Sequence, residues 1–237
     1  MKPNYINFDN IRDFTIALFC CLLCSTTMSP TFLLLLKHTV LLVICLVGDK
    51  LLQVVQKPPL LKAAVDNVTH ALIGLVVAEI VVHQFRDQLA RSELWLLIGF
   101  GFGLASWIDV DHFIEARSFH IHDATNLTHR PFLHNSVIFL VLLIATSVLV
   151  QVQDNFRLSI WTAIAFVAFF THHLRDAIRR GLWFRAPHLN YSTAPVLYWL
   201  YLALTQLCPH AVIQLLHLQT RGSAGDQAVR YRPLEVV

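Results

Sequence analysis

Four short segments concentrate the aspartates and histidines of this chain. They are residues 66–70, 106–112, 129–134 and 171–176, and each lies next to the end of a long apolar run. Imidazoles mixed with carboxylates suit zinc, manganese or iron, whereas the structural zinc sites built on cysteines need thiolates that these segments lack. The candidate metal ligands are His70, Asp109, Asp111, His112, His134, His172, His173 and Asp176.

Eight candidate ligands exceed one tetrahedral shell, so the segments predict one of two arrangements. Either two metal ions bind, or one ion binds and the remaining groups orient its ligands. His129 is a candidate for proton transfer, with a water on the metal as the alternative, and Arg130 is the second candidate catalytic residue. Arginines 130, 175, 179 and 180 crowd the same predicted face and could hold an anionic group such as a lipid phosphate.

Non-catalytic interpretations of the same residues stay open. An aspartate–histidine pair at a helix end can be a cap or a simple hydrogen-bonded pair. The whole cluster could then be a structural metal site, or a polar network that fixes the order of the helices. A transporter with a proton or metal relay is a third possibility, although Glu79 is the one deep acidic residue that favours it.

The composition indicates what must position these residues. Hydrophobic residues make up 56% of the 237 residues and charged residues only 14%, and the apolar residues form blocks long enough to cross hydrocarbon. We therefore expect an integral membrane protein whose main partner is the lipid bilayer. The formal net charge of +3 and the lack of a basic stripe with interleaved aromatics exclude a nucleic-acid-binding protein.

The apolar blocks predict an all-α, multi-pass transmembrane helical bundle. Six firm spans are expected at residues 33–52, 68–85, 94–110, 132–150, 158–174 and 195–218. Residues 14–28 could be a seventh span, a signal-anchor or a cleaved signal peptide. The predicted organisation is an N-terminal extension (1–30), the bundle (31–218) and a polar C-terminal tail (219–237).

Alternating spans would bring all four polar segments to one face of the membrane. The loops on that face carry more lysines and arginines than the loops on the other face, which favours a cytoplasmic location for it. The organelle is left open between the endomembrane system and the plasma membrane.

Five motifs carry a resemblance to known membrane proteins. They are residues 49–53, 66–70, 108–113, 130–134 and 172–183. At these motifs the chain resembles the metazoan transmembrane protein 267 family, over about residues 33–218. It is more distantly similar to bacterial YdjM-type inner-membrane proteins, which are described as metal-dependent hydrolases. That similarity implies a hydrolase-like activity on a membrane-embedded or anionic substrate, with His70, Asp109, Asp111, His112, His129, His134, His173 and Asp176 at the matching positions.

The third motif departs from the YdjM-type pattern. Pro131 replaces a glycine, Leu133 a threonine and Asn135 a serine. Two hydroxyl groups near the expected metal are therefore missing, and metal binding could survive where turnover does not.

Overall fold

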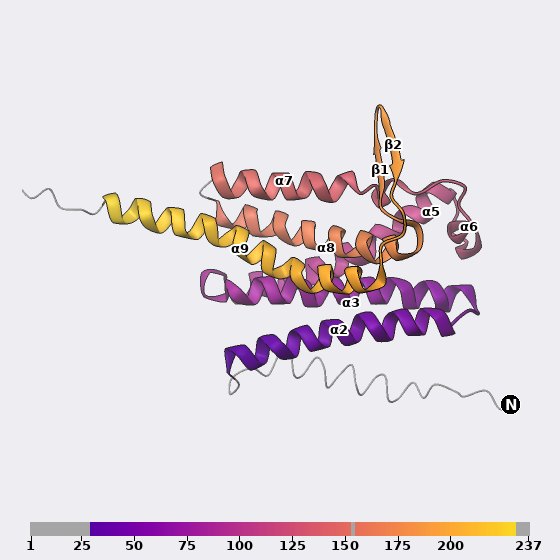
Figure 1. Cartoon of the computed structure of the whole chain (residues 1–237), viewed down its shortest axis with the longest axis horizontal. Helices are drawn as coiled ribbons and strands as arrows, with labels where there is room; N and C mark the ends of the chain where they lie inside the picture. Colours follow the sequence, from indigo (N-terminus) through magenta and orange to yellow (C-terminus); the bar gives the residue numbers. More distant parts are fainter. Residues whose placement is uncertain (1–28, 153–154, 231–237) are drawn as a thin grey trace, which may run out of the picture.

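Long helices run alongside one another and form the body of the molecule (Figure 1). The computed structural model describes residues 29–152 and 155–230, with side chains up to residue 220. The long helices are α2 (Pro30–Val54), α3 (Pro59–Gln84), α4 (Arg91–Trp107), α7 (Val137–Val152), α8 (Phe156–Arg180) and α9 (Tyr198–Arg230). Residues 14–28, the possible seventh span, lie outside the described residues.

Four stretches of helix are long and apolar enough to cross a membrane. They are Pro30–Val54, Pro59–Gln84, Arg91–Ala116 and Tyr198–Thr220. The six predicted spans coincide with the six long helices, but α7 has only 16 residues and α8 does not meet the same criteria of length and hydropathy. The all-α membrane bundle is thus supported with four candidate spans, and the predicted number of six is not confirmed.

Local sequence signals explain where the helices begin and end. The Ser29 hydroxyl accepts a hydrogen bond from the backbone N–H of Phe32, and the Asn155 side chain accepts one from Leu158, so that α2 and α8 each start with a side-chain cap. Helix α8 ends at Gly181, which has φ +69°. A Cβ at Gly181 would lie 2.0 Å from the carbonyl oxygen of Thr193, so this sharp turn requires glycine.

Helices α3 and α8 form the centre of the bundle, and the other long helices pack around them. Helix α3 approaches α4 closely, because a Cβ at Gly74 would meet the Gly101 carbonyl oxygen at 2.6 Å. Deep in the bundle, Lys37 of α2 forms an ion pair of 2.8 Å with Glu79 of α3. This pair lies more than two helical turns along α3 from His70, so Glu79 stands apart from the four polar segments.

Short elements fill one end of the bundle, where sequence analysis predicted only loops. After α4 come η2 (Ile108–Val110), α5 (Asp111–Ala116) and α6 (Ile121–Thr125), and η3 (Phe132–His134) precedes α7. A two-stranded antiparallel hairpin follows α8, with β1 (Trp183–Ala186) paired to β2 (Leu189–Ser192). The all-α class holds for the bundle, and the short hairpin is an addition within a predicted loop. A 3-10 turn, η1 (Arg86–Gln88), lies at the opposite end.

Several predicted helix boundaries were also wrong, for one reason. Helix α3 begins at Pro59 rather than at residue 68, and α8 continues to Arg180 rather than ending at 174. Helix α9 extends to Arg230, past the predicted start of the polar tail at residue 219. An apolar run marks the part of a helix that suits hydrocarbon, whereas the hydrogen-bonded helix continues into polar sequence.

Candidate metal centre

The four polar segments meet at the end of the bundle that carries the short helices (Figure 1). Asp109 lies in η2, at the end of α4, and His134 is the last residue of η3. His172 and Asp176 are one helical turn apart on α8. Sequence analysis placed His134 inside the span expected at residues 132–150. Helix α7 begins only at Val137, so His134 lies in the segment that precedes this helix.

Four side-chain atoms from these residues converge on one point, and we call Asp109, His134, His172 and Asp176 the central cluster. Nε2 of His134 lies 3.3 Å from Nε2 of His172, 3.6 Å from Oδ1 of Asp109 and 3.3 Å from Oδ2 of Asp176. Nε2 of His172 lies 3.5 Å from each of the same two oxygens. Tetrahedral bonds of about 2.0–2.2 Å would place ligand atoms about 3.3–3.6 Å apart, so these five separations, of the six edges of a tetrahedron, are compatible with a tetrahedral site.

Hydrogen bonds on the far side of each ring determine which nitrogens face the cluster. Nδ1 of His172 lies 2.9 Å from the carbonyl oxygen of Ala105, which can only accept, so Nδ1 carries the proton. Nδ1 of His134 faces the buried carboxylate of Asp111, with Oδ1 at 3.2 Å and Oδ2 at 3.3 Å. In both neutral rings Nε2 is left with its lone pair. Two lone pairs and two carboxylates that face one another favour a bound cation.

The pKa of His134 also indicates that a positive charge is stabilised within the central cluster. Burial by itself lowers the pKa of His134, but hydrogen bonds with Asp109, Asp111 and Asp176 outweigh it and raise the pKa well above its usual value. Three carboxylates thus direct their negative charge at one imidazole. A positive charge placed among them is strongly stabilised, either as a proton on His134 or as a metal ion that all four central groups share.

The remaining predicted ligands surround the central cluster. His70 is buried and stacks on His172 with 3.8 Å between ring centres, and its Nε2 lies 3.5 Å from Oδ1 of Asp176. Asp111 is fully buried; it accepts a hydrogen bond of 2.6 Å from the backbone N–H of Leu133 and orients His134. The presence of Leu133 in place of a threonine does not remove this hydrogen bond of Asp111, because the donor is the backbone N–H of residue 133.

The last two of the eight candidates lie at the edge of the cluster or turn away from it. Nδ1 of His112 lies 3.3 Å from Oδ1 of Asp111, at the edge of the cluster. His173 donates from Nδ1 to the carbonyl oxygen of Phe169 at 2.7 Å, and its ring centre lies 6.0 Å from that of His172.

Two separate groups of three residues also have the spacing for a metal ion. They are His70, His172 and Asp176, and Asp109, His112 and His134, each with ligand atoms within 4.8 Å of one another. The central cluster takes two residues from each group.

The predicted catalytic residues lie at the edge of the site. The ring of His129 is exposed, and its Nδ1 lies 2.9 Å from the hydroxyl of Thr128. Arg130 donates to the last backbone carbonyls of α8, those of Arg180 and Gly181, so it ties the loop carrying His134 to that helix. Neither residue contacts the central cluster directly.

Two groups of residues support the cluster: Asn67 with Ser106, whose role was not predicted, and Arg175, which was predicted to hold an anionic group and instead pairs with aspartates of the chain. Asn67 donates to Oδ2 of Asp109 at 3.1 Å and accepts from the Ser106 hydroxyl at 2.7 Å, which holds the carboxylate in place. The buried Arg175 donates to Asp49 at 2.8 Å and to Asp66 at 2.6 Å, and so joins α8 to α2 and α3. All of these residues except Ser106 fall within the motifs of the family resemblance, which was the signal that could have identified them.

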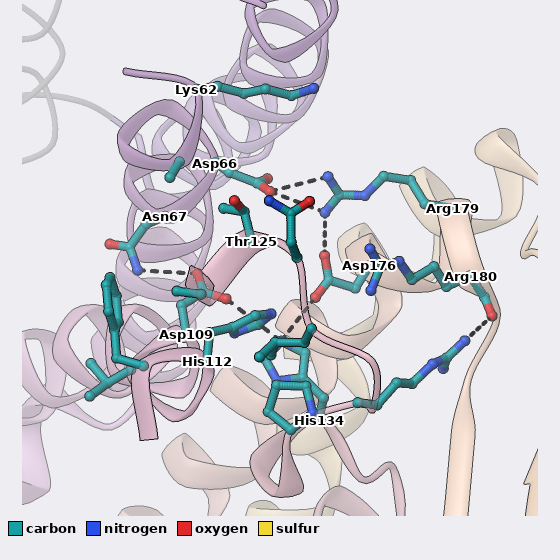
Figure 2. Close-up of a pocket in the computed structure, with 18 of the residues that line it drawn as sticks. Lys62, Asp66, Asn67, Asp109, His112, Thr125, His134, Asp176, Arg179 and Arg180 are labelled. Carbon is teal, nitrogen blue, oxygen red and sulfur yellow. Dashed lines mark hydrogen bonds and ion pairs between the residues drawn. The ribbon is translucent and has the colours of Figure 1, made fainter. Parts of the chain in front are cut away.

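A pocket of about 620 Å³ opens beside the central cluster (Figure 2). Asp109, His134 and Asp176 form part of its wall. Arg179 spans Asp66 and Asp176, with a nitrogen 2.6 Å from Oδ1 of Asp176. A small molecule that enters this pocket can therefore reach the atoms that would hold a metal.

Comparisons with known proteins identify relatives along most of the chain. Transmembrane protein 267 of Danio rerio is 37% identical over 179 residues, which are 73% of this chain and 76% of that protein. The Xenopus laevis protein of the same name is 37% identical over 170 residues, 70% of this chain and 74% of that protein. The Bos taurus protein is 35% identical over 171 residues, 70% and 75% respectively. No family model and no solved structure matches the chain.

Proposed function

This chain belongs to the transmembrane protein 267 family, and we propose that it is a multi-pass membrane protein with a divalent-metal site and hydrolase-like activity. The observation that carries the proposal is the central cluster. Its five measured separations of 3.3–3.6 Å suit a single tetrahedral ion. Zinc, manganese and iron all accept this set of two imidazoles and two carboxylates.

Each residue then has a definite task. His134, His172, Asp109 and Asp176 would hold the ion, and Asp111 and the Ala105 carbonyl would keep both imidazoles turned with Nε2 inward. A divalent ion bound there would act as a Lewis acid for hydrolysis of an ester. The exposed His129, or a water on the ion, is the candidate for moving a proton at the pocket.

The placement of the helices supports six crossings. Helix α7 and the preceding η3 lengthen the apolar stretch, and α8 is shielded from lipid because it lies at the centre of the bundle. With α7 and α8 included, the chain passes back and forth so that the central cluster lies at one membrane face. The larger number of basic residues in the loops of that face favours the cytoplasmic side.

Metal content tests the proposal. The full-length protein is purified in detergent without chelator, and bound zinc, manganese and iron are measured beside Asp109→Asn and Asp123→Asn. Asp123 is a carboxylate of the short helix α6, hydrogen-bonded to Ser118 outside the central cluster, and serves as the matched control. We expect about one ion per chain in the wild type and the control, and a loss of most of it in Asp109→Asn.

Two results would decide against parts of this proposal. A wild-type protein without metal would overturn the metal site and leave a polar network that fixes the helix order. A metal-loaded protein that hydrolyses neither carboxylate nor phosphate esters in mixed micelles would leave a structural metal site without catalysis.

A further inference from the structure

Two arginines beside the central cluster lack an acidic partner. Within residues 29–152 and 155–220, no carboxylate lies within 4 Å of the guanidinium of Arg130 or Arg180, whereas Arg175 and Arg179 are each paired with aspartates. Both unpaired arginines line the pocket, and Figure 2 shows the Arg180 side chain directed into it on the side of Asp176. The pocket thus has two positive charges that no described side chain neutralises.

These two positive charges are close enough to repel each other. Burial lowers the pKa of Arg130 first, and the positive charge of Arg180 lowers it further. Arg130 is held in this position by its bonds to the carbonyls of Arg180 and Gly181, so it cannot turn away. An anion between the guanidinium groups would remove the repulsion and accept charge-assisted hydrogen bonds from both. Lys62, on the opposite wall, adds a third cation to the pocket.

One part of the pocket wall is apolar. It consists of side chains of α3, α5 and α6, which are Leu60, Ala63, Ala64, Phe113, Ile121 and Ala124. The carboxylates that also line the pocket have their own partners: Arg179 pairs with Asp66 and Asp176, and Asp109 faces His134. Leu60 is 64% exposed at the start of α3, where the polypeptide leaves the apolar part of the bundle. A cavity with cations at one side and aliphatic side chains at the other suits an amphiphile with an anionic head.

We propose that the pocket binds a phosphate monoester, with the phosphate between Arg130 and Arg180 and the alkyl part against the apolar wall. This inference rests on the proposed function, because it names the substrate class of the same site. Hydrolysis of such an ester joins the oxygen of water to phosphorus and breaks the bond from phosphorus to the alkyl oxygen, which takes up a proton. The two arginines bind and orient the phosphate, while the central cluster lies beside it.

Binding of short-chain ligands to the full-length protein in detergent tests the inference. Three probes are compared: dioctanoyl phosphatidate, dioctanoylglycerol and inorganic phosphate. We expect phosphatidate to bind most tightly, inorganic phosphate to compete with it weakly, and dioctanoylglycerol to bind at least tenfold more weakly than phosphatidate. Arg180→Gln should weaken phosphatidate binding about tenfold or more, because it removes a charge-assisted interaction, and Arg180→Lys should recover part of it.

The matched control is Arg157→Gln. Arg157 is also an exposed arginine on α8, but it pairs with Glu93 at the opposite end of the bundle, so binding should remain within twofold of the wild type. Metal content is measured in every variant, and Arg180→Gln should retain the wild-type amount. Normal metal content also shows that the variant is folded.

Three outcomes are distinguishable. Unchanged phosphatidate binding in a folded Arg180→Gln protein overturns this inference and leaves the metal site intact. Equal affinity for inorganic phosphate and phosphatidate overturns the role of the apolar wall. Arginine-dependent binding to a wild-type protein that holds no metal supports the phosphate site and overturns the proposed metal site instead.

Discussion

Replacing Asp111 with asparagine tests whether the orientation of His134 serves a metal ion. Oδ2 of the fully buried Asp111 accepts from the backbone N–H of Leu133 at 2.6 Å, and Oδ1 lies 3.2 Å from Nδ1 of His134. Asparagine has the same size, and its oxygen can keep the bond from Leu133. The same oxygen, at the position of Oδ2, can still accept from Nδ1 of His134 at 3.3 Å, but the amide nitrogen replaces Oδ1 at 3.2 Å from that Nδ1–H, and two donors oppose each other there. The negative charge that orients His134 is also lost, so the ring is held less firmly with Nε2 toward a metal.

The size of the effect follows from this change of one hydrogen bond. Losing the group that orients a metal-binding histidine typically weakens metal affinity by about 10- to 100-fold. At a free metal concentration of about 100 times the wild-type Kd, binding stabilises the folded protein by about 2.7 kcal/mol. The same relation gives about 1.4 kcal/mol for a tenfold higher Kd and about 0.4 kcal/mol for a hundredfold higher Kd.

Two measurements on the full-length protein in detergent examine this prediction. Zn²⁺ affinity is obtained by competition with a chromogenic chelator, and unfolding is followed with and without Zn²⁺. Asp123→Asn removes a carboxylate from the exposed loop and should match the wild type in both assays. If Asp111→Asn binds Zn²⁺ within twofold of the wild-type affinity, the argument that Asp111 sets the His134 tautomer for a metal is refuted.

Two further predictions concern the packing that holds the site together. Gly74→Ala should lower the stability in detergent by about 1–3 kcal/mol, because its Cβ would lie 2.6 Å from the backbone of α4, whereas Gly99→Ala, with open space around its Cβ, should leave the melting temperature unchanged. Equal melting temperatures for the two variants would contradict the close approach of α3 and α4. Arg175→Gln should cost about 3–5 kcal/mol because it leaves Asp49 of α2 without a cationic partner and Asp66 of α3 with Arg179 alone, while Arg157→Gln at an exposed pair should cost at most about 1 kcal/mol. A chemical-denaturation series that gives both arginine variants the same stability would exclude the bridging role of Arg175.

The gathering of the site could be predicted from the sequence, because it depends only on the order of apolar and polar segments. If helices alternate in direction, the end of α4, the start of α7 and the end of α8 must share one end of the bundle. Asp109, His134 and His172 meet there although they are distant in sequence. The candidate ligands were therefore identified by topology, without knowledge of any distance.

The selection of four central residues from eight candidates could not be predicted. Consecutive residues of a helix point about 100° apart, so His172 faces the cluster while His173 turns toward the carbonyl of Phe169. Whether a given face of α8 points inward depends on the rotation of the whole helix, which its packing against α3 and α4 determines. The bond from Asn67 to Asp109 depends on the same close packing and leaves no pattern in the sequence.

The helices were predictable from hydropathy, but the elements at the site end were not. Residues 113–130 have no long apolar run, yet α5 and α6 form within them. The hairpin at 183–192 contains basic and polar residues that show no alternation strong enough to predict strands. These elements are stabilised by contacts with the rest of the molecule. The backbone N–H of Ser136, for example, donates to the carbonyl oxygen of Trp183 at 2.7 Å.

The distribution of the central residues along the chain has a consequence for biosynthesis. A nascent chain that has inserted only α2, α3 and α4 contains Asp109 but neither central imidazole. Residue 134 adds the first, and both residues of α8 arrive only after a second pair of helices has been made. If the central cluster holds an ion as proposed, chelation is therefore among the last events of maturation, and a chain in which α7 and α8 fail to pack against the other helices would remain metal-free. Loading with metal would then report correct assembly of the whole helical bundle.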